Sequence, residues 1–196
     1  MNAEQVALLR VLLAGTSLED DVVDFSAALG SAQQPAGGLL LVGTPDVEPW
    51  HFAAHLTDEA ELAQRPELTP TLVRWHVPAA APAHLAVGLD RIGRTPANET
   101  LLVVAPEAPP WQLLERVHDA RRGGAVVMSI DHGASELRDV VHEGLTVPAD
   151  DDAPYLDLVE HLVSAAAPGA VRRRLSVRSR LSRLLDRVQG AGDLSS

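Results

Sequence analysis

The sequence predicts an α/β protein in three layers, with a mainly parallel five-stranded sheet flanked by helices. The main observation is a set of continuous apolar runs at residues 39–43, 100–106 and 125–131. Such runs are typical of strands that are buried on both faces, as in parallel sheets covered by helices. Segments with helical spacing separate them, which predicts right-handed crossovers between parallel strands. Residues 1–170 contain no internal repeat and are expected to form one domain.

An N-terminal helical segment is predicted to precede the sheet. Residues 3–14 are apolar around more than half of the helical circumference, which is typical of a helix buried on several sides or at an oligomer interface. Ser17 offers an N-cap for a second helix, and acidic residues follow it where the helix dipole favours negative charge. Residues 30–38, "GSAQQPAGG", are predicted to form the loop that leads into the first strand.

The remaining elements are expected between and after the apolar runs. Pro49 suits the first position of a helix that carries His51 and His55. A strand is expected at 72–77, and a short helix that turns into an edge strand is expected at 135–149. Further helices are expected at 83–92, 110–124 and 153–167.

The composition argues against several classes of protein. The 196 residues include no cysteine, so neither a disulfide nor a thiolate zinc site is expected. No apolar stretch reaches the roughly 18 residues of a membrane span, so a membrane is not an expected partner. The first residues lack the basic start and cleavage site of a secretory signal. The expected location is the cytoplasm.

Charge divides the chain into an acidic body and a basic C-terminal tail. Residues 1–170 contain nine arginines against 25 acidic residues, a balance of −16, which argues against a nucleic-acid surface. Residues 171–189 contain seven arginines against Asp186, a balance of +6. The tail, residues 171–196, could form a basic amphipathic helix or remain a solvated terminus. The solvated terminus, or packing on the acidic body, is the interpretation we favour.

Four strings occur in a fixed order along the chain: "LLLVGTPDVEPWHFAAHL", "IGRTPANETLLVV", "DARRGGAVVMSID" and "RDVVHEGLTVPA". Together they resemble the sugar isomerase (SIS) domain, in particular the phosphoheptose isomerase branch, over residues 3–168. The resemblance implies a parallel α/β sheet and a site for a sugar-derived small molecule. It also implies a homodimer or homotetramer in which the N-terminal helices pack across the interface, as the apolar residues 3–14 suggest independently.

The resemblance implies a metal site on the helix after the first strand. In the metal-using members of the family, that helix bears a His ligand and a Glu that is both ligand and base; His51 matches the first position and His55 the second. An ungapped count along the closing helix places Asp157 at a further ligand position, with His161 one turn beyond. His51, His55 and Asp157 are therefore candidate ligands of a divalent metal such as zinc, and His55 and His161 are candidate catalytic residues. The alternative is a pair of half-exposed histidines that bind nothing.

The two loops that bind phosphate in the family differ here from the family pattern. The first loop, "GTPDVEP", retains Gly43 and Thr44 as candidate ligand-binding residues but adds Asp46 and Glu48. The second, "APEAPPW", has no hydroxyl, three prolines without N–H donors, and Glu107. Because a phosphate needs such donors and is repelled by carboxylates, weak or absent binding of sugar phosphates is expected.

A polar segment, "SIDHGASE", follows the run at 125–131. Asp131, His132 and Ser135 are candidate ligand-binding residues because α/β sheets bind ligands beyond the carboxyl ends of their strands. The alternative, which we favour, is a polar turn in which Ser135 caps the next helix.

Two functions follow as alternatives. The first, which we favour, is a non-catalytic SIS module that binds a carbohydrate derivative, or acts as a scaffold, through a degenerate site. The second is a metal-assisted sugar (phosphate) isomerase, so whether the chain is an enzyme is left open.

Overall fold

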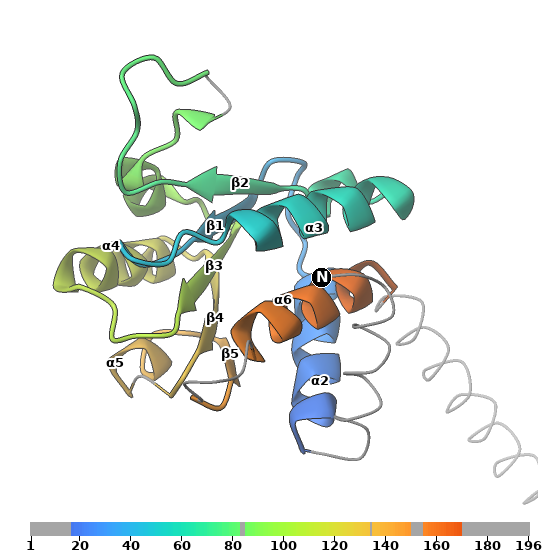
Figure 1. The fold of residues 1–196 in the computed structure, drawn as a ribbon. Helices are drawn as coiled ribbons and strands as arrows, with labels where there is room; N and C mark the ends of the chain where they lie inside the picture. The colour runs from blue at the N-terminus through green and yellow to red at the C-terminus, as the bar shows by residue number, and fades with distance from the viewer. Residues whose placement is uncertain (1–16, 83–84, 134, 150–154, 170–196) are drawn as a thin grey trace, which may run out of the picture.

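The computed structural model describes residues 17–82, 85–133, 135–149 and 155–169, and these contain a five-stranded sheet (Figure 1). Its order is β2-β1-β3-β4-β5, and each neighbouring pair is parallel. The predicted three-layer α/β class is therefore confirmed. The strands are β1 (Leu39–Val42), β2 (Pro70–Val73), β3 (Thr100–Ala105), β4 (Val126–Asp131) and β5 (Glu143–Thr146).

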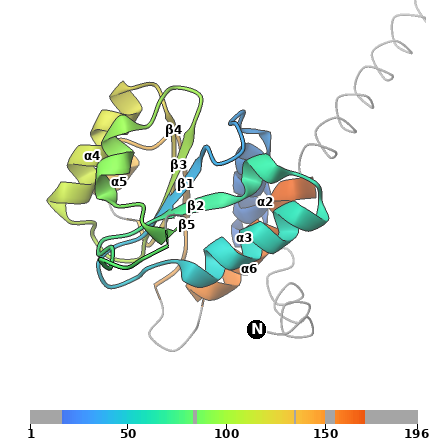
Figure 2. The ribbon, with the colours of Figure 1, turned by 90° about the horizontal axis from the view of Figure 1, so that it is seen from above.

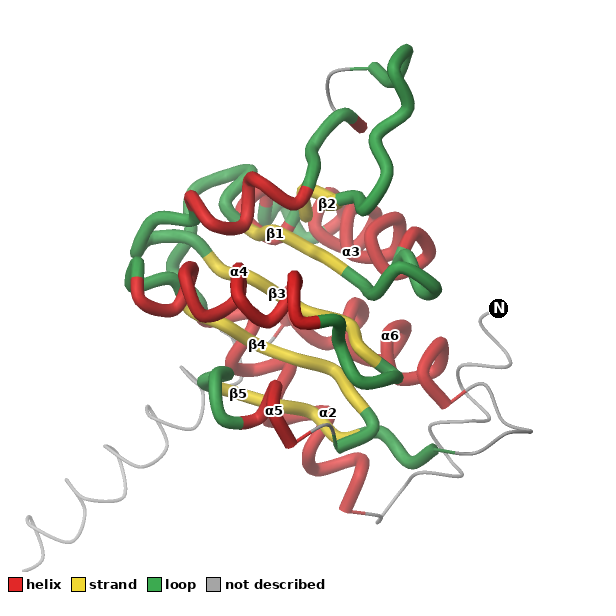
Figure 3. Tube along the Cα trace, turned by 90° about the vertical axis from the view of Figure 1, so that its left-hand side faces the viewer, coloured by secondary structure: helices red, strands yellow, loops and turns green. Residues whose placement is uncertain are grey.

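Helices cover both faces of the sheet, as Figures 2 and 3 show from two directions. One face carries α2 (Ser17–Ser31), α3 (Trp50–Leu62) and α6 (Tyr155–Ala166). The other carries α4 (Trp111–Arg122), α5 (Ser135–Arg138) and the 3₁₀ helix η3 (Leu89–Arg94). Two more 3₁₀ turns, η1 (Pro66–Leu68) and η4 (Ala167–Gly169), follow α3 and α6.

The continuous apolar runs arise because each strand supplies two cores. Leu39 and Leu41 of β1 enter the core under α2, α3 and α6, whereas Leu40 and Val42 enter the core under α4. All six residues of β3 are buried for the same reason. Burying a leucine side chain contributes about 1.5–3 kcal/mol, so removing the helices from either face would expose a large apolar area.

The segment between β2 and β3 differs from the prediction. The helix expected at 83–92 is wrong: the described part of this segment contains η3 from Leu89, preceded by an extended Gly88 with φ −102° and ψ 175°. Gly88 pairs with Arg74 in an isolated parallel bridge, which holds the chain in an extended conformation. The strand expected at 72–77 likewise begins at Pro70 and ends at Val73.

Arg65 joins the ends of three helices. It follows α3, and its guanidinium donates one hydrogen bond to the carbonyl oxygen of Gly30 near the end of α2, at 2.7 Å, and another to that of Pro168 beyond α6, at 3.2 Å. It also pairs with Glu67, whose pKa this hydrogen bond lowers. Since the carbonyl ends of helices carry partial negative charge, this half-buried cation stabilises the ends of α2 and α6.

Two regions singled out from the sequence lie outside the described residues. These are the apolar helix at 3–14 and the arginine-rich tail at 171–196. The division of the chain at residue 170 and the assembly through residues 3–14 stay predictions. In the parts that the structure describes, every helix is too short or too polar to cross a membrane.

Candidate functional site

The order of the strands places a candidate site at the carboxyl edge of the sheet. The chain leaves β1 for α3 on one face and β3 for α4 on the other, so the direction of winding reverses between these two neighbouring strands. Ligands of open α/β sheets bind in the crevice at such a switch point. The loops at 43–49 and 106–110 follow β1 and β3 at this point, and they are the same loops that depart from the family pattern.

The first loop is closed on itself. The side-chain oxygen of Thr44 accepts a hydrogen bond from the backbone N–H of Val47 at 3.2 Å, and Thr44 is only 2% exposed. A Cβ at Gly43 would lie 1.8 Å from the carbonyl oxygen of Val47, so only glycine permits this turn. The carbonyl of Gly43 in turn accepts a hydrogen bond from Nε1 of Trp75 at 2.8 Å. Gly43 and Thr44 therefore shape the loop, and one N–H that could bind an anion is already used.

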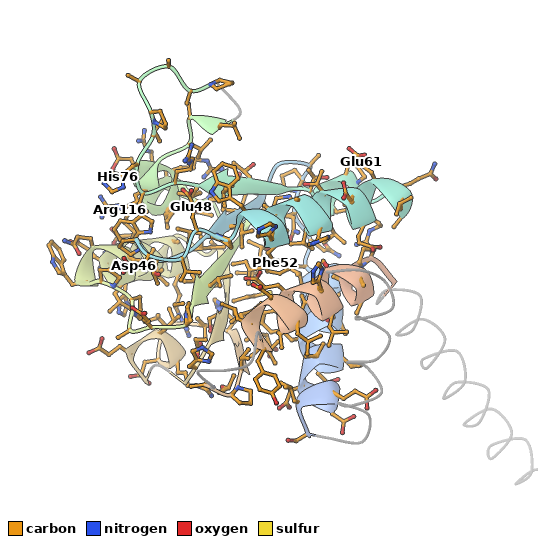
Figure 4. The ribbon with its side chains drawn as sticks, in the orientation of Figure 1. Asp46, Glu48, Phe52, Glu61, His76 and Arg116 are labelled. Atoms are coloured by element: carbon orange, nitrogen blue, oxygen red, sulfur yellow. The ribbon has the colours of Figure 1, made fainter. Side chains whose placement is uncertain are left out.

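A cluster of three side chains, Glu48, Trp50 and Arg74, lies beside this loop. Arg74 donates to Glu48 through both Nε and Nη2, at 3.1 Å and 3.4 Å, and its guanidinium carbon lies 4.7 Å from the centre of the Trp50 ring. The indole N–H of Trp50 also donates to Glu48. Figure 4 shows Glu48 and Asp46 on the loop that precedes α3. Glu48 therefore neutralises the charge of Arg74 beside the candidate site.

The second loop offers little to an anion. Glu107 is exposed, Pro109 is buried, and Trp111, the first residue of α4, is 67% exposed. Asp46 on the first loop is exposed too. The two loops thus present carboxylates and aromatic surface. The weak binding of phosphate stays a prediction.

Asp131 and His132 organise the turn after β4. Asp131 is fully buried, and its carboxylate accepts hydrogen bonds from Ser129 Oγ and from the backbone N–H of Gly133, both at 2.7 Å. Nδ1 of His132 lies 2.7 Å from the carbonyl oxygen of Val147, which makes it the donor. These contacts favour the polar turn over a ligand site. Ser135 is the first residue of α5, and its role as the cap of that helix stays a prediction.

The structure brings together the two candidate catalytic histidines. The ring centres of His55 on α3 and His161 on α6 lie 3.8 Å apart, with an angle of 58° between the ring planes. Burial lowers the pKa of His161, and the neighbouring His55 lowers it further, while Asp157 acts in the opposite direction. Because a second charged imidazole nearby would repel its charge, the contact favours the neutral form of His161.

The donors around this pair do not complete a metal site. Within the described residues, no group of three or more His, Asp or Glu side chains is arranged to hold a metal ion. His51 and Asp157 are both exposed. A zinc-like role for His51, His55 and Asp157 therefore stays a prediction, and we derive no chemical step from it.

A buried acid on α6 was missed by the sequence analysis. Glu160 is 5% exposed, and burial, with a contribution from the charge of Asp157, raises its pKa to about 8. It is therefore mostly protonated at neutral pH. A carboxyl group inside the apolar stretch "YLDLVEHLV" was the available signal, since an acidic residue is seldom buried unless it is paired.

Known structures share this fold at low sequence identity. The sugar isomerase domain of the RpiR transcription factor from Sphaerobacter thermophilus matches with a TM-score of 0.53 and 13% identity, over 91% of this chain and 97% of that one. A candidate sugar-binding protein from Salmonella typhimurium LT2 matches with a TM-score of 0.52 and 17% identity, over 89% of this chain and 52% of its own. This chain thus spans about half the length of the Salmonella protein.

A candidate sugar-phosphate isomerase from Listeria monocytogenes matches with a TM-score of 0.51 and 10% identity, over 81% of this chain and 78% of that one. No protein-family model matches the sequence, and no curated protein matches it. The chain therefore has the fold of a sugar isomerase domain, as the resemblance implied. Identities this low show the fold and do not transfer an activity.

Proposed function

We propose that this chain, with its sugar isomerase fold, is a non-catalytic module that binds a carbohydrate derivative at the carboxyl edge of its sheet. The observation that supports this most is the closed first loop. The Thr44 hydroxyl accepts a hydrogen bond from Val47, and Arg74 forms an ion pair with Glu48. The proposed site lies at the switch point, where this kind of fold binds ligands, but it lacks the free hydrogen-bond donors that a phosphate requires.

The electrostatics support the same proposal. Asp46 and Glu107 are exposed on the two loops, and the nearby cation Arg74 is already paired. Like charges repel, although solvent and salt screen the repulsion between exposed groups. A phosphate dianion beside these loops would meet that repulsion with little to offset it.

The alternative is a metal-assisted sugar (phosphate) isomerase, and one observation favours it. His55 and His161 are in contact, although they come from different helices. A neutral imidazole with a lowered pKa can act as a general base. Isomerisation also needs a substrate beside the base, however, and the carboxylates of the two loops oppose a phosphorylated one.

The experiment is a thermal-shift screen of the purified chain with sugars, sugar phosphates, nucleotide sugars and divalent ions, followed by calorimetry on every hit. The proposal expects a sugar-derived ligand that stabilises the protein, with no turnover of sedoheptulose 7-phosphate before or after zinc is added. The matched variant His55→Gln should bind that ligand as the wild type does. Turnover by the wild type that disappears in His55→Gln would establish the isomerase instead.

A further inference from the structure

All three tryptophans of this chain lie at the carboxyl edge of the sheet. Trp50 follows the loop after β1, Trp75 lies two residues beyond β2, and Trp111 follows the loop after β3. Aromatic residues make up only 3% of the sequence, so this edge holds half of the phenylalanine, tyrosine and tryptophan in the protein. The indole N–H of Trp75 is used in a structural hydrogen bond to Gly43, whereas Trp50 and Trp111 are 38% and 67% exposed.

Trp50 differs from Trp111 because its ring is held in place. Its indole N–H donates to Glu48, and Arg74 lies over its ring at 4.7 Å while pairing with the same carboxylate. Each of the three side chains thereby contacts the other two. An exposed aromatic ring whose rotamer is already fixed loses little conformational entropy when a ligand stacks against it.

We propose that Trp50, Glu48 and Arg74 form a binding site for a neutral saccharide. The inference rests on the proposed function and names the class of ligand: a sugar ring without a phosphate. A pyranose has an apolar C–H face that can pack against an indole, and a rim of hydroxyls that both donate and accept hydrogen bonds. Glu48 supplies the acceptors and Arg74 the donors for such a rim, next to the exposed part of the ring.

The charge of the cluster sets this preference. Glu48 and Arg74 neutralise each other, so a neutral ligand can bind without breaking their ion pair. A phosphate would have to displace Glu48 from Arg74 and would also meet Asp46, which is exposed on the same loop. Because hydroxyls can bond to the outer lone pairs and N–H groups of an intact ion pair, the saccharide avoids both penalties.

The test is calorimetry of the full chain with maltose, glucose, N-acetylglucosamine, glucose 6-phosphate and N-acetylglucosamine 6-phosphate. We expect at least one neutral sugar to bind, and each 6-phosphate to bind about ten-fold more weakly than its parent. Trp50→Ala should weaken neutral-sugar binding about ten-fold or more. Leu62→Ala is the control, because it also removes an exposed apolar side chain from α3 but lies at the last residue of that helix, away from the cluster, and it should leave binding unchanged.

A measurement on the wild type covers the case in which Trp50→Ala does not fold. The chain has only three indole N–H groups, so their NMR signals can be assigned by single Trp→Phe replacements. Titration with the neutral sugar should shift the Trp50 signal and leave that of Trp111 in place. If 6-phosphates bind more tightly than their parent sugars, or if Trp111 responds and Trp50 does not, the inference is wrong and the proposed function survives. If none of these sugars binds, the inference is wrong, and the wider ligand screen described above decides the proposed function separately.

Discussion

Replacing Glu48 by glutamine should convert the cluster beside the first loop into a phosphate site. In the wild type, Nε and Nη2 of Arg74 donate to the two carboxylate oxygens of Glu48, and the two side chains are 18% and 24% exposed. Glutamine retains an oxygen that can accept the indole N–H of Trp50, so the loop should keep its shape. The change removes one negative charge and leaves the guanidinium with free donors.

The size of the effect follows from the charge that is removed. A unit charge about 5 Å from a phosphate contributes roughly 3 kcal/mol at an effective dielectric constant of about 20, and partial exposure reduces this figure. We therefore expect glucose 6-phosphate to bind Glu48→Gln at least about ten-fold more tightly than it binds the wild type, which corresponds to ~1.4 kcal/mol. The lost ion pair should lower the free energy of unfolding by about 1–2 kcal/mol.

The assay is calorimetry with glucose 6-phosphate at low and moderate salt, because the gain should shrink as ions screen it. Glu107→Gln is the matched control: it removes the same charge from the loop after β3, where no arginine among the described residues pairs with Glu107. It should raise the affinity much less than Glu48→Gln. Equal gains from the two variants would mean that only net charge matters, and no gain from either would refute the role assigned to Arg74.

Three further predictions concern stability and assembly. Arg65→Ala should lower the free energy of unfolding by about 2–3 kcal/mol in urea titrations, because two helix-end carbonyls and Glu67 lose their partner. The control Arg122→Ala removes an exposed ion pair and should have no measurable effect. Equal losses of stability in the two variants would contradict the role of Arg65. Glu160 has a pKa of about 8 in the native state and an ordinary pKa of 4.5 in the unfolded chain. Between these two pH values the native state therefore holds a proton that the unfolded chain has released. Its contribution to stability should therefore fall between pH 4.5 and 8 and level off above 8. Glu160→Gln should flatten that slope in melts across this range, whereas Glu61→Gln, at an exposed position of α3, should not; an unchanged slope in Glu160→Gln would rule the burial effect out. Leu12→Glu should yield monomers or aggregates with a lower melting temperature if residues 3–14 form the subunit interface, and light scattering of the wild type near 20.8 kDa would reject the oligomer.

The strands were predictable because their signal is strong and local. A strand buried on both faces has few polar positions, so the largely apolar runs at 39–43, 100–106 and 125–131 predicted β1, β3 and β4 to within one residue at either end. The helix predicted at 83–92 was wrong because a contact with a residue distant in sequence overrides the helical spacing of its apolar residues. The bridge between Arg74 and Gly88 holds the backbone extended there, and no property of residues 83–92 alone reveals that partner.

The candidate site was predictable only in part, for a similar reason. The loops followed from the resemblance, and Glu48 was recognised as an added carboxylate. Its partner Arg74 lies 26 residues further on, in a segment that was interpreted only as a strand. The pair forms because β1 and β2 are parallel neighbours, which brings their carboxyl ends together. Sequence spacing could not supply that adjacency before the order of the strands was known.

The ion pair between Glu48 and Arg74 links two features of this edge: the shortage of free donors for a phosphate, and the cluster of Glu48, Trp50 and Arg74. The carboxylate of Glu48 accepts hydrogen bonds from Arg74 and from the Trp50 indole, as a bound anion would. It is tethered to the same loop, so it competes with any free anion at an effective concentration in the millimolar range or above. A phosphorylated sugar must exceed that competition, whereas an uncharged sugar does not enter it. Specificity against phosphate would then arise from an anion within the chain, and Glu48→Gln separates this mechanism from a simple loss of binding.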